Sequence, residues 1–146
     1  MQTGMIHAHS GLRWILLILL IITVINAYMK WKGEKDFTSG DDKLSLWTMM
    51  VTHIQLLLGL YLFFTSGKVM LSGLDMANAV GRFYTIEHTL GMMLAIVLIT
   101  LGRVQAKKIV TAAGKHKKIF TMFLIALLII LLSIPWPFRD LGASWF

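Results

Sequence analysis

LRWILLILLIITVINAYM, residues 12–29, carries a single charged side chain, Arg13, in an otherwise nearly apolar run. A membrane-spanning helix needs about 20 predominantly apolar residues at about 1.5 Å per residue, and in lipid such a helix satisfies its own backbone groups. Three later stretches are similarly long and apolar. The sequence therefore predicts an all-α membrane protein, a four-helix up-down-up-down transmembrane bundle forming a single domain over residues 1–146, with spans at about 9–29, 45–66, 82–102 and 119–137.

The composition agrees with a chain that lies mostly in a lipid bilayer. Hydrophobic residues make up 57% and charged residues only 14%, with a mean hydropathy of +0.73. A soluble domain carries about a quarter charged residues. The absence of cysteine excludes disulfides, zinc–thiolate sites, iron–sulfur clusters and covalent c-type haem.

The net charge of +7 does not indicate nucleic-acid binding, because the basic residues gather in two loops between spans. Residues 30–43 and 103–118 hold ten of the 14 lysines and arginines, and His116 falls in the second loop. Basic loops face the cytoplasm, so we expect a bacterial inner (cytoplasmic) membrane protein with both termini periplasmic. Aromatic residues near the expected span ends fit an interfacial belt, namely Trp14, Tyr28, Trp31, Trp47, Trp136, Trp145 and Phe146.

Few ionisable side chains fall within the spans, and these are His9, Arg13, His53, Glu87 and His88. Ionisable groups are costly in lipid, so each is a candidate for function. Counted along ideal helices from the expected cytoplasmic ends of the spans, His9 lies at a height of roughly 28 Å, His88 at roughly 21 Å and His53 at roughly 9 Å. His9 and His88 therefore share the outer leaflet.

Two histidines at similar depth on different helices are what b-type haem (haem b) requires, since neutral imidazoles bind the iron from opposite faces. We expect His9 and His88 to bind the haem iron, with His53 as a further candidate for cofactor binding. Arg13 would pair with a propionate. Gly11 and Gly91 would leave room for a flat macrocycle.

Other interpretations of these side chains remain open. Glu87 is a possible second-shell partner that orients a ligand imidazole, or it forms an ion pair with Arg82 or Arg13. His7, His9, Glu87 and His88 could instead hold a non-haem zinc or copper ion. Histidines near span ends also serve as plain interfacial residues, and His53 could be satisfied by a hydrogen bond between helices.

The segments HSGLRW (9–14), THIQLLLG (52–59), EH (87–88) and IPWPFR (134–139) resemble a group of small four-span proteins of Bacteroidetes-type bacteria labelled "cytochrome b"-like. The resemblance covers the chain from His9 to Phe146. The H-x-x-G pattern at His88–Gly91 is also similar to the haem-binding helices of haem A synthases, and it implies His88 as an axial ligand.

Three functions follow from these observations. The first is a membrane haem protein that carries electrons, for example between a quinone and a periplasmic acceptor. The second is a small structural or accessory subunit without a cofactor, which contacts other membrane subunits or a second copy of itself. The third is a proton or ion relay element using His53 and Glu87. No pattern indicates an enzyme with a covalent nucleophile: the chain lacks cysteine, and Ser10 beside His9 is not a triad.

Overall fold

The computed structural model describes residues 2–73, 75–143 and 145, and within that part it contains helices and no strand. Four of the helical stretches described there are long and apolar enough to cross a membrane, which confirms the expected all-α four-helix bundle. The elements are α1 (Gln2–Lys32), α2 (Ser39–Thr65), α3 (Ala79–Arg82), the π-helical η1 (Phe83–Glu87), α4 (His88–Lys108), α5 (Ala112–Ser133) and the short 3₁₀ helix η2 (Pro137–Arg139).

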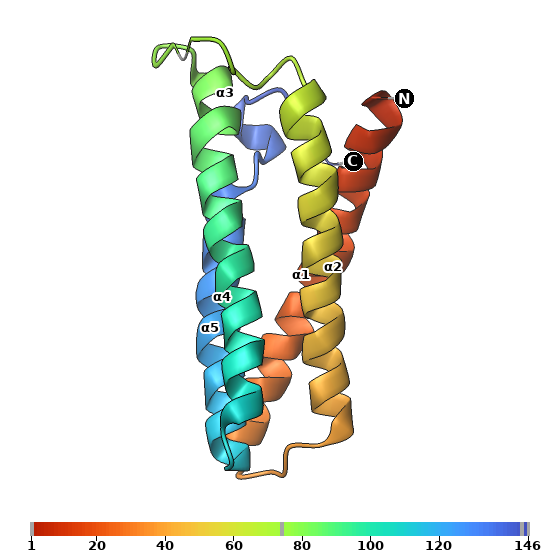
Figure 1. The fold of residues 1–146 in the computed structure, drawn as a ribbon, viewed down its shortest axis with the longest axis vertical. Helices are drawn as coiled ribbons and strands as arrows, with labels where there is room; N and C mark the ends of the chain where they lie inside the picture. Colours follow the sequence, from red (N-terminus) through yellow and green to blue (C-terminus); the bar gives the residue numbers. More distant parts are fainter. Residues whose placement is uncertain (1, 74, 144, 146) are drawn as a thin grey trace.

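The long helices run up and down in turn, as Figure 1 shows. Both chain termini and the connection between α2 and α3 lie at one end of the bundle, here called the terminal end. The short α1–α2 and α4–α5 connections lie at the other, here called the basic end because most lysines gather there. The third span is one continuous helical stretch, Ala79–Lys108, in which α3, η1 and α4 follow each other without a break.

Several helix ends differ from the expected spans: α2 begins at Ser39 rather than 45, α4 ends at Lys108 rather than 102, and α5 begins at Ala112 rather than 119. The first helix begins at Gln2 rather than near residue 9, so His7 and His9 both lie within α1. The last helix ends at Ser133, before the expected boundary at 137, because Pro135 and Pro137 cannot donate backbone hydrogen bonds to the preceding turn.

The core is formed mainly by α1, α4 and α5. Leu20, Ile99 and Phe123 are fully buried there. Gly102 lets α4 and α5 approach closely, since a Cβ at this position would lie 2.7 Å from the Cβ of Met122. Small residues at helix contacts are the usual means of close packing in lipid, where no hydrophobic force drives helices together. By contrast, α2 is the least buried of the four spans among the described residues.

Aromatic side chains gather at both ends of the bundle. Trp14 lies 6.2 Å from Trp136 and 6.3 Å from Trp145, ring centroid to ring centroid, at the terminal end. At the basic end, Tyr28 and Trp31 both pack against Phe120. These clusters have the placement of interfacial belts. Phe146, expected in the same belt, lies outside the described residues.

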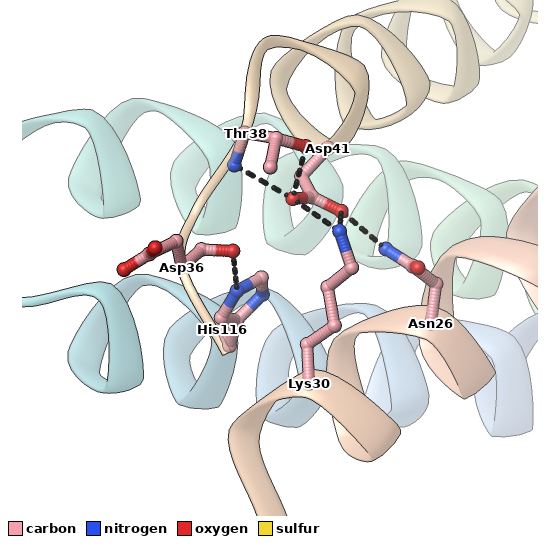
Figure 2. Close-up of polar contacts among 6 residues, drawn as sticks. All are labelled: Asn26, Lys30, Asp36, Thr38, Asp41 and His116. Carbon is pink, nitrogen blue, oxygen red and sulfur yellow. Dashed lines mark hydrogen bonds and ion pairs between the residues drawn. The ribbon is translucent and has the colours of Figure 1, made fainter. Parts of the chain in front are cut away.

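A polar network closes the basic end (Figure 2). The carboxylate of Asp41 is buried and accepts hydrogen bonds from Lys30 at 2.8 Å, from Asn26 at 2.7 Å and from the main chain and hydroxyl of Thr38. His116, expected in a basic loop, is instead buried on the first turns of α5, where its Nε2 lies 3.3 Å from the main-chain oxygen of Asp36. The network fixes the α1–α2 turn against α5.

Candidate functional site

A cavity of about 330 Å³ opens in the terminal half of the bundle, between α1, α2, α4 and the chain that follows α5. Most of its lining is apolar, and its titratable lining side chains are His9, Arg13, Lys68, Tyr84 and His88. No acidic side chain lines it among the described residues. A mainly apolar cavity with a few convergent polar groups is the usual form of a cofactor site.

His88 enters the cavity directly after the π-helical segment Phe83–Glu87. A π turn inserts one extra residue into the helix, which rotates the residues before it by about 100° relative to those after it. Such segments occur frequently at functional sites. Here the hydroxyl of Thr89 donates to the main-chain oxygen of Tyr84 at 2.9 Å, five residues earlier, and supports the widened turn.

The ring of His88 is oriented by the end of α5. Its Nδ1 donates a hydrogen bond to the main-chain oxygen of Ser133 at 2.8 Å. In a continued α-helix this oxygen would accept from the N–H of residue 137, but Pro137 has none. With its hydrogen on Nδ1, a neutral His88 keeps the lone pair of Nε2 for a ligand, an arrangement typical of histidines that bind metals.

His9 approaches from α1 and lies against α2. A Cβ built on Gly59 would lie 3.3 Å from the Cε1 of His9, so the ring occupies the space that the glycine leaves. Gln55 donates its side-chain amide to the main-chain oxygen of His9 at 2.8 Å. The Nδ1 of His9 is buried and has no hydrogen-bond partner among the described residues.

The rings of His9 and His88 lie edge to face, with ring centroids 6.3 Å apart and planes at 69°. With an imidazole nitrogen about 2.0–2.1 Å from a bound metal and about 1.1 Å from its own ring centroid, two imidazoles on opposite sides of one ion have centroids about 6.3 Å apart. Edge-to-face aromatic contacts cover about 4.5–7 Å, so the separation alone does not select a metal. The Nε2 lone pair of His88 and the cavity beside both rings would allow a ligand to bind between or beside the two imidazoles.

Two cations border the cavity. Arg13 is buried, donates from one terminal nitrogen to the main-chain oxygen of Trp145 at 2.8 Å, and leaves its Nε buried without a partner in the described part of the chain. Lys68 donates to the main-chain oxygen of Gly142 and lies 4.9 Å from the Tyr84 ring centroid. Burial lowers the pKa of Lys68. Two cations without a lining carboxylate suit a ligand that carries negative groups.

The other histidine candidates lie away from this site. His53 is not part of the cavity lining: its Nδ1 lies 2.8 Å from the main-chain oxygen of Met49 and its Nε2 lies 3.4 Å from the hydroxyl of Thr100. His7 is exposed. Among the described residues no three histidine or acidic side chains gather as a metal cluster, so the structure does not bring His7, His9, Glu87 and His88 together as a non-haem site.

Glu87 takes the second of its two expected roles, an ion pair. Its carboxylate accepts from Arg82 Nε at 2.9 Å on the exposed side of the helix. The main-chain oxygen of Ser133, and not Glu87, orients the ring of His88. His53 and Glu87 are thus engaged with different partners, and among the described residues no hydrogen bond or ion pair joins them.

The glycines near the site have other roles than the sequence indicated. Gly91 was expected to make room for a macrocycle, but it faces Ser133, whose Oγ would lie 2.0 Å from an added Cβ. Gly11 has nothing within 4 Å of such a Cβ and is not part of the cavity lining. Gly59 is the glycine that gives His9 its space. Sequence reasoning missed Gly59, Lys68 and Ser133, although the proline four residues after Ser133 signals its free carbonyl.

In comparisons with protein-family models, curated proteins and solved structures, nothing matches this chain.

Proposed function

We propose that the chain is a membrane protein that carries electrons with one b-type haem, bound through His9 and His88. The observation that carries the proposal is the 6.3 Å separation of the two ring centroids beside an apolar cavity. The Nδ1–H of His88 donates to the main-chain oxygen of Ser133. When bound, the iron porphyrin supplies reversible one-electron oxidation and reduction. The resemblance to small "cytochrome b"-like four-span proteins points the same way and stays a prediction.

Each group around the cavity has a defined part in this proposal. His9 and His88 hold the iron from α1 and α4, while the apolar lining excludes water. Arg13 and Lys68 supply positive charge for the two propionates, and a guanidinium can bind a carboxylate through two parallel hydrogen bonds. Burial of the site and the hydrogen bond to the ligand imidazole set the reduction potential.

The lysine distribution favours a cytoplasmic basic end in a bacterial inner membrane. The His9–His88 cavity then lies near the periplasmic surface. This location suits transfer between a quinone in the bilayer and a periplasmic acceptor, and the partners would be other membrane subunits or a second copy of the chain.

An optical spectrum of the purified protein, expressed in a host that supplies haem, tests the proposal. A Soret band and a reduced α-band of b-haem type, at one haem per chain by haemochrome assay, are expected. His88→Ala and His9→Ala should each lose most of this absorbance. His53→Ala is the matched control and should keep it. A colourless but folded protein under these conditions would overturn the proposal.

A second candidate is an accessory subunit without a cofactor. It is favoured by α2, the least buried span, whose exposed apolar side chains include Trp47, Leu57 and Phe64. Lipid or a neighbouring helix could cover this face. The same purification separates the two functions, since an accessory subunit would be colourless and would be recovered with a partner whether or not His88 is replaced.

A further inference from the structure

A second pocket, of about 280 Å³, lies at the basic end of the bundle, remote from the histidine site. It lies between the start of α2, the last turns of α4 and the first turns of α5. Its charged lining residues are Asp42, Arg103, Lys107 and Lys115. The three cations outnumber the single carboxylate, so the pocket attracts anions.

Arg103 is the residue that makes this pocket a candidate anion-binding site. Its side chain is buried, with 6% of the residue exposed, although it carries a full charge at the end of a span. One terminal nitrogen pairs with Asp42 at 2.9 Å, while its Nε is buried without a partner in the described part of the chain. A guanidinium has five N–H donors, so the ion pair leaves most of its capacity unused. A buried donor without a partner is destabilising, so Arg103 is an unusual residue to find at this position.

The acidic residues nearby do not neutralise the pocket. Asp41 is fully engaged by Lys30, Asn26 and Thr38 and is not part of the lining (Figure 2). Asp42 is partly exposed, and its carboxylate pairs with Arg103 and with no other side chain that the structure describes. Lys107 lies one turn after Arg103 on α4, on the same face, and Lys115 approaches from α5.

The lining also offers neutral donors at the N-terminus of α2. Ser39 lies in the lining at the first position of α2, where the helix dipole is positive and favours an anion. The hydroxyl of Ser45, also in the lining, is engaged with the main-chain oxygen of Asp42. One planar fork, two ammonium groups and a hydroxyl are donors that a tetrahedral oxyanion uses. Basic pockets between transmembrane helices at the membrane surface bind phospholipid headgroups in the same way.

We propose that the pocket lined by Arg103, Lys107 and Lys115 binds a phosphate group, either of an anionic phospholipid headgroup or of a free phosphate ester. The proposal is independent of the haem, and its test uses no haem signal. Binding there would tie the α1–α2 turn to α4 and α5 and stabilise the basic end of the bundle.

The test measures the thermal unfolding midpoint of the whole protein in neutral detergent, with phosphatidylglycerol, phosphatidylcholine or inorganic phosphate added. Phosphatidylglycerol is expected to raise the midpoint and phosphatidylcholine is not. A rise with phosphatidylglycerol alone assigns the site to lipid headgroups, and an equal rise with inorganic phosphate assigns it to free phosphate. No rise with either probe overturns the proposal.

Two variants of equal charge locate the effect. Lys107→Gln with Lys115→Gln removes both ammonium groups of the pocket and should abolish the phosphate-dependent rise. Lys108→Gln with Lys118→Gln removes two lysines that do not line the pocket and should preserve the rise. Arg103→Lys keeps the charge, loses the fork and should weaken apparent binding about tenfold, or about 1.4 kcal/mol. An equal loss in both lysine pairs would assign the effect to overall charge and overturn the proposal.

Discussion

The main-chain oxygen of Ser133, at the end of α5, accepts a hydrogen bond of 2.8 Å from the Nδ1 of His88 on α4. Pro137 leaves this oxygen without its helical donor, and Gly91 allows Ser133 to approach α4. The backbone break at the Pro135–Pro137 segment and the orientation of the His88 imidazole are therefore one structural feature. Loss of such a partner typically costs a metal site about 10–100-fold in affinity or activity.

Gly91→Ala tests this coupling. The added methyl group would lie 2.0 Å from the Oγ and 2.9 Å from the Cβ of Ser133, so α5 must move away from α4. Haem affinity, measured by transfer of haem to a competing acceptor, is expected to fall about 10–100-fold. Gly11→Ala is the control, because its methyl group meets nothing within 4 Å. Equal haem retention in the two variants would contradict the coupling.

Substitutions at Gly59 are expected to lower haem content without lowering the stability of the fold. Alanine there adds helix propensity of about 1 kcal/mol but forces the ring of His9, 3.3 Å away, to shift by a few tenths of an ångström. We expect Gly59→Ala to keep its thermal midpoint while haem content falls, and Gly59→Leu to lose haem almost completely. The comparison requires haem content and unfolding on the same preparations. Full haem content in Gly59→Leu would contradict the placement of His9.

Arg13→Gln removes a buried cation next to the cavity. A positive charge near the haem stabilises the reduced state, which carries one more electron, so its removal should lower the midpoint potential. Haem retention should fall as well, because a propionate loses its partner. Arg82→Gln is the control, since Arg82 pairs with Glu87 on the exposed side of the third span. An unchanged potential in Arg13→Gln, determined by redox titration, would remove Arg13 from the site.

Asp41→Asn tests the polar network that closes the basic end. Asp41 is 6% exposed as a residue and its carboxylate accepts from three residues, so its neutralisation removes the counter-charge of Lys30. The expected loss is about 3 kcal/mol of folding stability, seen as a lower thermal midpoint in detergent. Asp42→Asn should cost less, because Asp42 is partly exposed and forms one ion pair, with Arg103, in the described part of the chain. Equal losses would mean that burial of Asp41 does not matter.

The four spans could be read from the sequence because length and hydropathy alone decide them. Counting along helices also put His9 and His88 in one layer, and both line the same cavity. That layer follows from the fixed rise per residue. Arg13, expected to pair with a propionate, lines this cavity too, and its propionate role stays a prediction.

What counting could not give is the rotation of each helix about its axis. His53 lies at a depth that the sequence allowed for a ligand, yet its ring is held between Met49 and Thr100. Gly91 faces α5 and Gly59 faces His9, a difference set by helix packing and by the π-helical turn before His88. Burial of His116 against Phe37 likewise depends on how the α1–α2 turn folds over α5.

The most direct test of the proposed iron site is low-temperature electron paramagnetic resonance of the oxidised protein, with His9→Ala and His88→Ala measured alongside. Wild-type protein is expected to show a low-spin ferric signal of bis-histidine type. Each single variant should lose that signal, through conversion to high-spin iron or loss of haem, while His53→Ala keeps it. An unchanged low-spin signal in His9→Ala or His88→Ala would contradict the assignment of these two residues as the ligand pair.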